Sequence, residues 1–242
     1  MMGSDMHVLL AARRARRRLL HCGLSASALL LAGAGGWLAP ALAHAAAPGA
    51  SAAGSPGLRE ILVVGDSLSA EYGLERGAGW VALLSQRLAA GKEGWSVFNA
   101  SISGDTTAGG LARLPALLRR RPAIVVIELG ANDALRGLPL ADSRRNLEAM
   151  ATQATAAGAR LLVVGMQVPP NYGRQYTSDF AQMYVDVAAA HKAALVPFLL
   201  KGVADRPDAD DWFQADHLHP AAKAHPLILD NVWPALKPLL KP

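Results

Sequence analysis

The chain has 242 residues, which is enough for one sizeable α/β domain or at most two small ones. Its formal net charge of +5 arises mainly at the N-terminus, because five of the 24 basic residues lie within residues 13–18. The rest of the chain is nearly neutral and shows no basic stripe, which argues against a nucleic-acid-binding protein. The single cysteine, Cys22, also lies near the N-terminus, so the remainder offers no thiol for a disulfide, a thiolate metal site or a cysteine nucleophile.

The first 45 residues are typical of an export signal. An arginine-rich segment is followed by an apolar run from Leu19 to Leu42, and the small-residue sequences Ala41-Leu42-Ala43 and Ala43-His44-Ala45 resemble cleavage sites. We therefore predict a signal peptide over residues 1–45, a periplasmic or secreted protein, and no stable membrane anchor after cleavage. A retained anchor is the alternative, but polar residues, glycine and proline interrupt the apolar run. The order Arg16-Arg17-Arg18 also fits twin-arginine export.

Residues 46–57 are rich in alanine, proline, glycine and serine and predict a flexible linker before one domain over residues 58–242. In that domain, strand-like and helix-like segments alternate about five times without an internal repeat. Several of the strand-like segments are continuous apolar runs, as expected for parallel strands covered on both faces. This alternation predicts a three-layer α/β/α domain with a mainly parallel sheet, but it does not give the strand order. The predicted strands are Ile61–Val64, Ser96–Asn99, Ala123–Leu129, Arg160–Met166 and Ala194–Phe198.

The segments between these strands are predicted to form amphipathic helices. Pro115 is a candidate break in the second helix. Asp142 or Ser143 is expected to cap the third, and Pro220 is expected at the first position of the last. His191 is interpreted as a structural residue at the end of the fourth. Apolar residues recur at helical spacing over 80–88, 111–118, 140–157, 180–191 and 228–236.

Polar or glycine-containing loops follow the predicted strands in four places. The parallel topology brings the first three loops to the carboxyl edge of the sheet, where open α/β sheets bind ligands, and the fourth could fold back to them. Read alone, the first loop is a common turn sequence. The coincidence of all four at strand ends favours a chemical role. The loops are Gly65-Asp66-Ser67, Asn99–Thr107, Glu128–Asp133 and Asp216–Pro220.

Each group that a serine hydrolase needs has a candidate in these loops. Ser67 is a candidate nucleophile, and it requires a base that takes its proton. Asp216 and His219 lie three residues apart, so the carboxylate could orient the imidazole. The N–H groups of Ser67 and Gly104 and the amide of Asn132 are candidate oxyanion donors, each worth about 3–4 kcal/mol in the transition state. Such a mechanism calls for no metal and no cofactor.

These loops resemble the sequence blocks of the SGNH (GDSL-type) hydrolases. Gly65-Asp-Ser-Leu-Ser69, Gly104, Asn132 and Asp216-x-x-His219-Pro match the family blocks, and the flanking residues are similar to bacterial periplasmic acyl-CoA thioesterase I, lysophospholipase and arylesterase enzymes. The resemblance implies a flavodoxin-like, five-stranded parallel sheet of order 2-1-3-4-5. It also implies an enzyme that cleaves carboxylic esters and thioesters through an acyl-enzyme on Ser67, with small-molecule ester, thioester or lysophospholipid substrates.

Three residues depart from the pattern of these relatives. Glu71, Ala131 and His217 stand where glycine is frequent, and Glu71 would place a carboxylate near the nucleophile loop, which leaves a preference for anionic substrates open. Four loop residues could line an acyl groove or could simply pack in their loops: Leu135, Leu138, Pro169 and Tyr172. Two other functions stay open, namely a polysaccharide O-deacetylase of the same fold and a non-catalytic acyl-lipid-binding module.

Overall fold

The computed structural model describes residues 59–91 and 94–241. The predicted signal peptide and linker lie outside the described residues. Within the described part, no helix is both long enough and apolar enough to cross a membrane.

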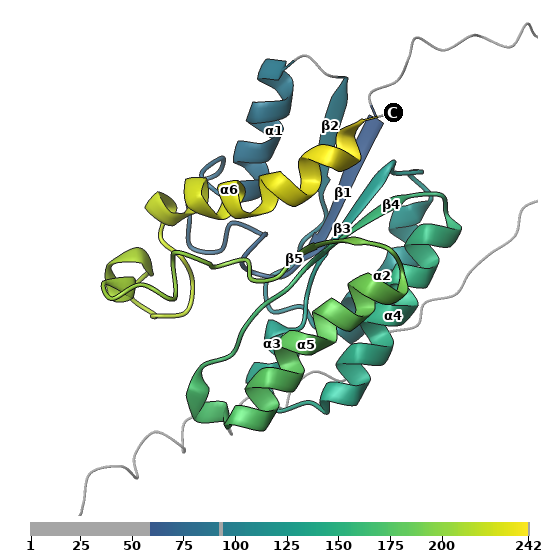
Figure 1. The fold of residues 1–242 in the computed structure, drawn as a ribbon. Helices are drawn as coiled ribbons and strands as arrows, with labels where there is room; N and C mark the ends of the chain where they lie inside the picture. Colours follow the sequence, from purple (N-terminus) through teal and green to yellow (C-terminus); the bar gives the residue numbers. More distant parts are fainter. Residues whose placement is uncertain (1–58, 92–93, 242) are drawn as a thin grey trace, which may run out of the picture. The chain divides into compact units, whose positions relative to one another are not determined.

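A five-stranded sheet forms the centre of the domain (Figure 1). All neighbouring strands are parallel, and their order is β2-β1-β3-β4-β5, which confirms the predicted topology. The apolar residues of the three inner strands β1, β3 and β4 are almost completely buried, as their continuous apolar sequences predict. The strands are β1 (Arg59–Gly65), β2 (Trp95–Asn99), β3 (Ile124–Glu128), β4 (Arg160–Val164) and β5 (Ala194–Val196).

Helices cover both faces of this sheet and complete the three predicted layers (Figure 1). On one face, α1 (Trp80–Gly91) packs beside α6 (His225–Leu236). On the other, α4 (Leu140–Ala156) packs between α2 (Thr107–Leu118) and α5 (Arg174–Ala190). A short helix α3 (Ala131–Leu135) follows β3 directly. Four single-turn 3-10 helices complete the described part: Pro170–Tyr172, Ala209–Trp212, Ala222–Ala224 and Lys237–Leu240.

Three expectations about helix boundaries were wrong. Helix α2 continues through Pro115, which removes one intrahelical hydrogen bond, the one from its own nitrogen to the carbonyl of Leu111. Helix α4 begins at Leu140 without a side-chain cap; Ser143 donates its hydroxyl hydrogen to Asp133 instead. Pro220 lies in an isolated antiparallel bridge with Phe213, and α6 begins five residues later. The expected position of His191 at a helix end is confirmed, since it is the C-cap residue that follows α5.

Candidate active site

The serine predicted as nucleophile stands at the tip of a tight turn after β1. The N–H of Ala70 donates to the carbonyl of Asp66 at 2.9 Å, and the Asp66 side chain accepts the N–H of Leu68 at 3.0 Å. These two bonds close the turn beneath Ser67, whose side chain lines a cavity at the carboxyl edge of the sheet. The predicted placement of Gly65-Asp66-Ser67 at this edge is therefore what the structure shows.

Glu128, the last residue of β3, supports this turn from below. Its Oε2 accepts the N–H of Asp66 at 3.3 Å and the hydroxyl of Ser69 at 2.8 Å. A Cβ on Gly65 would lie 2.8 Å from the same oxygen, so only glycine fits at the end of β1. Complete burial raises the pKa of Glu128 well above its ordinary value, and the nearby Asp66 carboxylate adds to the rise.

The buried Glu128 predicts a pH-dependent stability. Because its pKa is raised on folding, the folded state binds a proton more tightly than the unfolded state, so the parent loses stability as the pH rises above about 4.5. Glu128→Gln removes this loss. We expect the melting temperature of the variant, relative to that of the parent, to increase by several degrees from pH 4.5 to pH 7.5. A change of about 1 kcal/mol in the free energy of unfolding moves the melting temperature by about 2–4 °C.

Differential scanning fluorimetry at several pH values measures this difference. The matched control is Glu75→Gln, which makes the same chemical change at an exposed glutamate. If the melting temperature of Glu128→Gln fell relative to that of the parent as the pH rises, the raised pKa of Glu128 would be contradicted.

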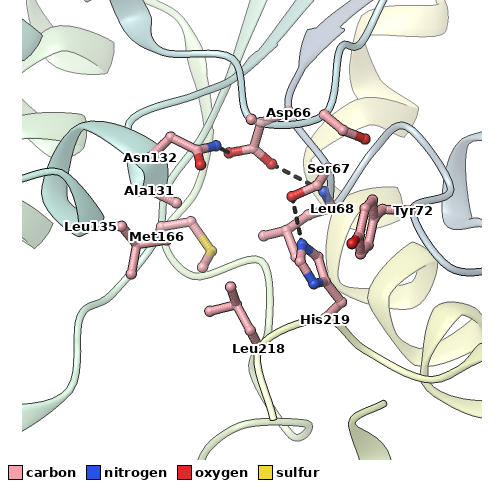
Figure 2. A pocket seen from close by; sticks show the side chains of 12 residues that line it. Asp66, Ser67, Leu68, Tyr72, Ala131, Asn132, Leu135, Met166, Leu218 and His219 are labelled. Carbon is pink, nitrogen blue, oxygen red and sulfur yellow. Dashed lines mark hydrogen bonds between the residues drawn. The ribbon is translucent and has the colours of Figure 1, made fainter. Parts of the chain in front are cut away.

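A hydroxyl, an imidazole and a carboxylate are linked in series above the turn. Figure 2 shows the first contact of the series, between Ser67 and His219. Ser67 Oγ lies 2.9 Å from His219 Nε2, and His219 Nδ1 lies 2.7 Å from Asp216 Oδ2. The other oxygen of Asp216 accepts the N–H groups of Leu218 and His219 at 3.0 Å each. These hydrogen bonds lower the pKa of Asp216, and the largest effect comes from the bond donated by the backbone N–H of His219. The carboxylate is therefore ionised at neutral pH.

Two further residues hold the histidine in place, and sequence reasoning did not find them. The ring of Tyr72 lies against the imidazole of His219, with 4.3 Å between the ring centroids. Gln214 joins the two loops, because its side-chain amide donates to the carbonyls of Tyr72 and Pro220 at 2.9 and 3.1 Å. A tyrosine and a glutamine in loops carry no sequence signal for such roles, since the contacts of Tyr72 with His219 and with Gln214 join residues more than 140 positions apart.

The two other predicted oxyanion donors line the same cavity. Gly104 has a φ of +78°, a conformation that favours glycine, and its loop connects β2 to α2. Asn132 lies in the first turn of α3, directly after β3. The buried carboxylate of Asp133 ties these loops together, because it accepts the N–H and the hydroxyl of Thr107 at 2.9 and 2.5 Å. The structure thus brings Ser67, Gly104, Asn132 and His219 around one cavity.

This cavity has a volume of about 340 Å³ and a mainly apolar wall. Of the four residues predicted for an acyl groove, Leu135 lines the cavity, whereas Leu138, Pro169 and Tyr172 do not. Five other apolar residues line the cavity, and none of them was predicted as part of its wall: Leu68, Tyr72, Ala131, Met166 and Leu218.

Glu71 is not among the residues that line this cavity. Its carboxylate accepts the N–H groups of Gly77 and Gly79 at 3.1 and 2.9 Å and so closes its own loop. Glu71 and His217 both have left-handed backbone, with φ of 60° and 52°, a conformation that glycine adopts more easily than other residues. Over residues 59–91 and 94–241, no group of three or more His, Cys, Asp or Glu side chains is placed to hold a metal ion.

A serine–histidine–aspartate series at the wall of a cavity, at the carboxyl edge of a parallel sheet, is the arrangement that serine hydrolases use. The model of the GDSL-like Lipase/Acylhydrolase family matches residues 63–227. The chain is also 56% identical to Esterase TesA of Pseudomonas aeruginosa over 181 residues, which cover 74% of this chain and 89% of the relative.

A second relative is Thioesterase 1/protease 1/lysophospholipase L1 of Escherichia coli, 40% identical over 74% of this chain and 84% of the relative. Among solved structures, a crystal structure of TesA superposes with a TM-score of 0.71 at 55% identity, covering 75% of this chain and 99% of that chain. The chain therefore belongs to the GDSL-like lipase/acylhydrolase family, and it is an ester-hydrolysing enzyme of that family.

Proposed function

We propose that the chain is an exported serine hydrolase that cleaves carboxylic esters and thioesters through an acyl-enzyme on Ser67. The observation that carries this proposal is the continuous series from Ser67 through His219 to Asp216 at the wall of an apolar cavity. The catalytic and oxyanion residues in the following steps are part of the proposal.

In the acylation step, Ser67 Oγ attacks the carbonyl carbon of the ester while its proton passes to His219 Nε2. Asp216 accepts the Nδ1–H of His219, which keeps the lone pair on Nε2 and stabilises the imidazolium that forms. The negative charge on the carbonyl oxygen is bound by the N–H groups of Ser67 and Gly104 and by the amide of Asn132. The imidazolium then gives its proton to the leaving alcohol or thiol.

In the deacylation step, a water molecule replaces the leaving group. His219 takes a proton from this water, the hydroxide attacks the acyl carbon, and the same donors bind the oxyanion. Collapse of the intermediate returns the proton to Ser67 Oγ and releases the acid. Each group returns to its starting state, so the cycle consumes only water.

The chemistry of the wall supports substrates with apolar acyl or aryl groups. Apart from Asp66, His219 and the small polar residues, the side chains that line the cavity are apolar or aromatic, and none is basic. About 0.8 kcal/mol is gained for each methylene group that leaves water, so an acyl chain that fills this cavity gains binding energy with length. The names of the relatives, an esterase and a thioesterase/lysophospholipase, agree with this substrate class.

Steady-state kinetics across a series of esters and acyl thioesters of increasing chain length test the function. We expect kcat/KM to rise from acetyl to medium-length acyl groups and then to level off as the cavity fills. Acetylated xylan is the comparison substrate. If the protein has a higher kcat/KM for acetyl-xylan than for every longer acyl ester, it is a polysaccharide O-deacetylase and the proposed substrate class is wrong.

Leu135→Trp should shorten the preferred acyl chain, because the larger ring would fill part of the cavity. Loss of about two or three methylene contacts predicts a fall of about 10–50-fold in kcat/KM for octanoyl esters, with acetyl esters nearly unchanged. The matched control is Leu138→Trp, since Leu138 lies three residues away and does not line the cavity. Equal effects of the two variants on octanoyl esters would contradict the assignment of Leu135 to the acyl wall.

Export is the part of the proposal that depends on the N-terminal sequence alone. Cleavage after either small-residue site gives a mature protein that begins at His44 or Ala46. N-terminal sequencing of protein recovered from outside the cytoplasm tests this expectation. Recovery of a membrane-bound form that keeps the apolar run Leu19–Leu42 would show an anchor instead.

A further inference from the structure

The geometry points to Asp66 as a positioning residue that holds one N–H of the Asn132 amide so that the other N–H faces the oxyanion. This inference rests on the proposed function, since it concerns the proposed role of Asn132. Asp66 precedes the nucleophile in the chain, and it would act through Asn132 rather than on the substrate.

The two carboxylate oxygens of Asp66 have separate partners. Oδ1 accepts the N–H of Leu68 at 3.0 Å, and Oδ2 accepts the side-chain N–H of Asn132 at 3.0 Å (Figure 2). A primary amide carries two hydrogens in fixed directions, so binding one of them sets the direction of the other. Because Asn132 lines the cavity beside Ser67, its remaining N–H is available to an oxyanion there.

The Asp66 side chain is itself fixed by burial and by hydrogen bonds, so it can fix the orientation of Asn132. The residue is 1% exposed, and its N–H donates to Oε2 of the buried Glu128 at 3.3 Å. Rotation of its side chain would break the bond to Leu68 that shapes the nucleophile turn. The N–H of Ser67 and the amide of Asn132 are therefore joined by a single buried residue, which fixes the spacing between two of the proposed oxyanion donors.

The charge on Asp66 suits this role at weakly alkaline pH. Burial raises the pKa of Asp66 to about 6, and the bonds from Leu68 and Asn132 oppose the rise. The titratable groups that act on it are Glu128 beneath the turn, His219 across the cavity, which lowers its pKa, and Asp105, which raises it. At pH 8 the Asp66 carboxylate is ionised and accepts the Asn132 N–H, so the test is made at that pH.

Asp66→Asn changes the hydrogen bonding without changing the shape of the side chain. The single oxygen of the new amide is needed by the N–H of Leu68, so the NH₂ group faces the NH₂ group of Asn132. Two donors cannot pair, and Asn132 turns away from the oxyanion. We expect kcat for a soluble ester to fall about 10²-fold with KM nearly unchanged, as for the loss of one oxyanion donor.

A double-mutant cycle with Asn132→Ala separates this role from a general effect on the turn. If Asp66 acts through Asn132, the double variant should be no slower than Asn132→Ala alone. Ser69→Ala is the matched control, because Ser69 supports the same turn through Glu128 and does not contact Asn132. The factors by which Ser69→Ala and Asn132→Ala each lower kcat should multiply in the double variant. Multiplicative losses for Asp66→Asn would overturn the inference.

Inhibition by an alkylboronic acid gives a readout that a purely structural role would not move. The tetrahedral adduct on Ser67 carries an oxygen in the oxyanion position, so Asp66→Asn should weaken inhibition by about the same factor as it lowers kcat. Unchanged inhibition with a normal melting temperature would overturn the inference. If Asn132→Ala itself leaves kcat unchanged, the proposed oxyanion site fails; if only Asp66→Asn is without effect, the present inference alone fails.

Discussion

Ser67→Ala should lower kcat for ester hydrolysis by about 10⁵-fold while KM and the melting temperature stay close to those of the parent. The loss is large because Ser67 Oγ is the atom that would form the acyl-enzyme, and it lies 2.9 Å from the base His219. The neighbouring hydroxyl of Ser69 cannot replace it, since that group is buried and bonded to Glu128 and Trp80. Initial rates on p-nitrophenyl esters give the measurement.

Ser103→Ala is the control for this variant. Ser103 also lines the cavity, but Nε2 of His219 pairs with the hydroxyl of Ser67, so the replacement of Ser103 should change kcat by less than about threefold. A Ser67→Ala protein that keeps more than a small fraction of the parental rate would show that another group is the nucleophile.

Asp216→Asn should lower kcat by about 10²–10⁴-fold, the second largest effect that the geometry predicts. The remaining oxygen of the asparagine would stay with the N–H groups of Leu218 and His219, so its NH₂ group would face Nδ1 of His219. That contact favours the tautomer with hydrogen on Nε2, which cannot take the proton of Ser67. The side chain of Asp216 is 40% exposed, so water can partly replace it and the lower part of the range is expected.

The control for Asp216→Asn is Asp210→Asn. Asp210 lies 3.6 Å from His217, a histidine in the same loop that does not contact the serine, and its side chain is almost fully exposed. We expect its replacement to leave kcat within about twofold of the parent. Equal losses for the two variants would mean that general charge in this loop, rather than orientation of His219, controls the rate.

The sheet could be predicted from the sequence because its inner strands are buried on both faces. Runs such as Ile61–Val64 and Ile124–Ile127 have no polar residue, and such runs alternate with helical spacing. The strand order came from the family resemblance, since apolar periodicity carries no information on which strands pair. Strand ends were less accurate: β4 and β5 each end two residues before the predicted point.

Three of the loops that form the site were recognisable because each combines polar chemistry with the end of β1, β2 or β3, and the fourth was recognisable by the spacing of Asp216 and His219. What could not be predicted was how the loops hold one another. Asp66 bonds Asn132 across 66 positions, and Gln214 bonds Tyr72 across 142. Aspartate and glutamine in loops have many possible partners, and only the folded chain selects one. The same reason explains why Ser143, expected to cap α4, is bonded to Asp133 instead.

Labelling with an alkyl fluorophosphonate, followed by intact-mass measurement and peptide mapping, tests most directly that Ser67 is the nucleophile activated by His219. We expect one adduct per chain, located on Ser67, that is absent in Ser67→Ala and forms far more slowly in His219→Ala. A parent protein that hydrolyses esters but gives no adduct, or one that is modified at another residue, would contradict it.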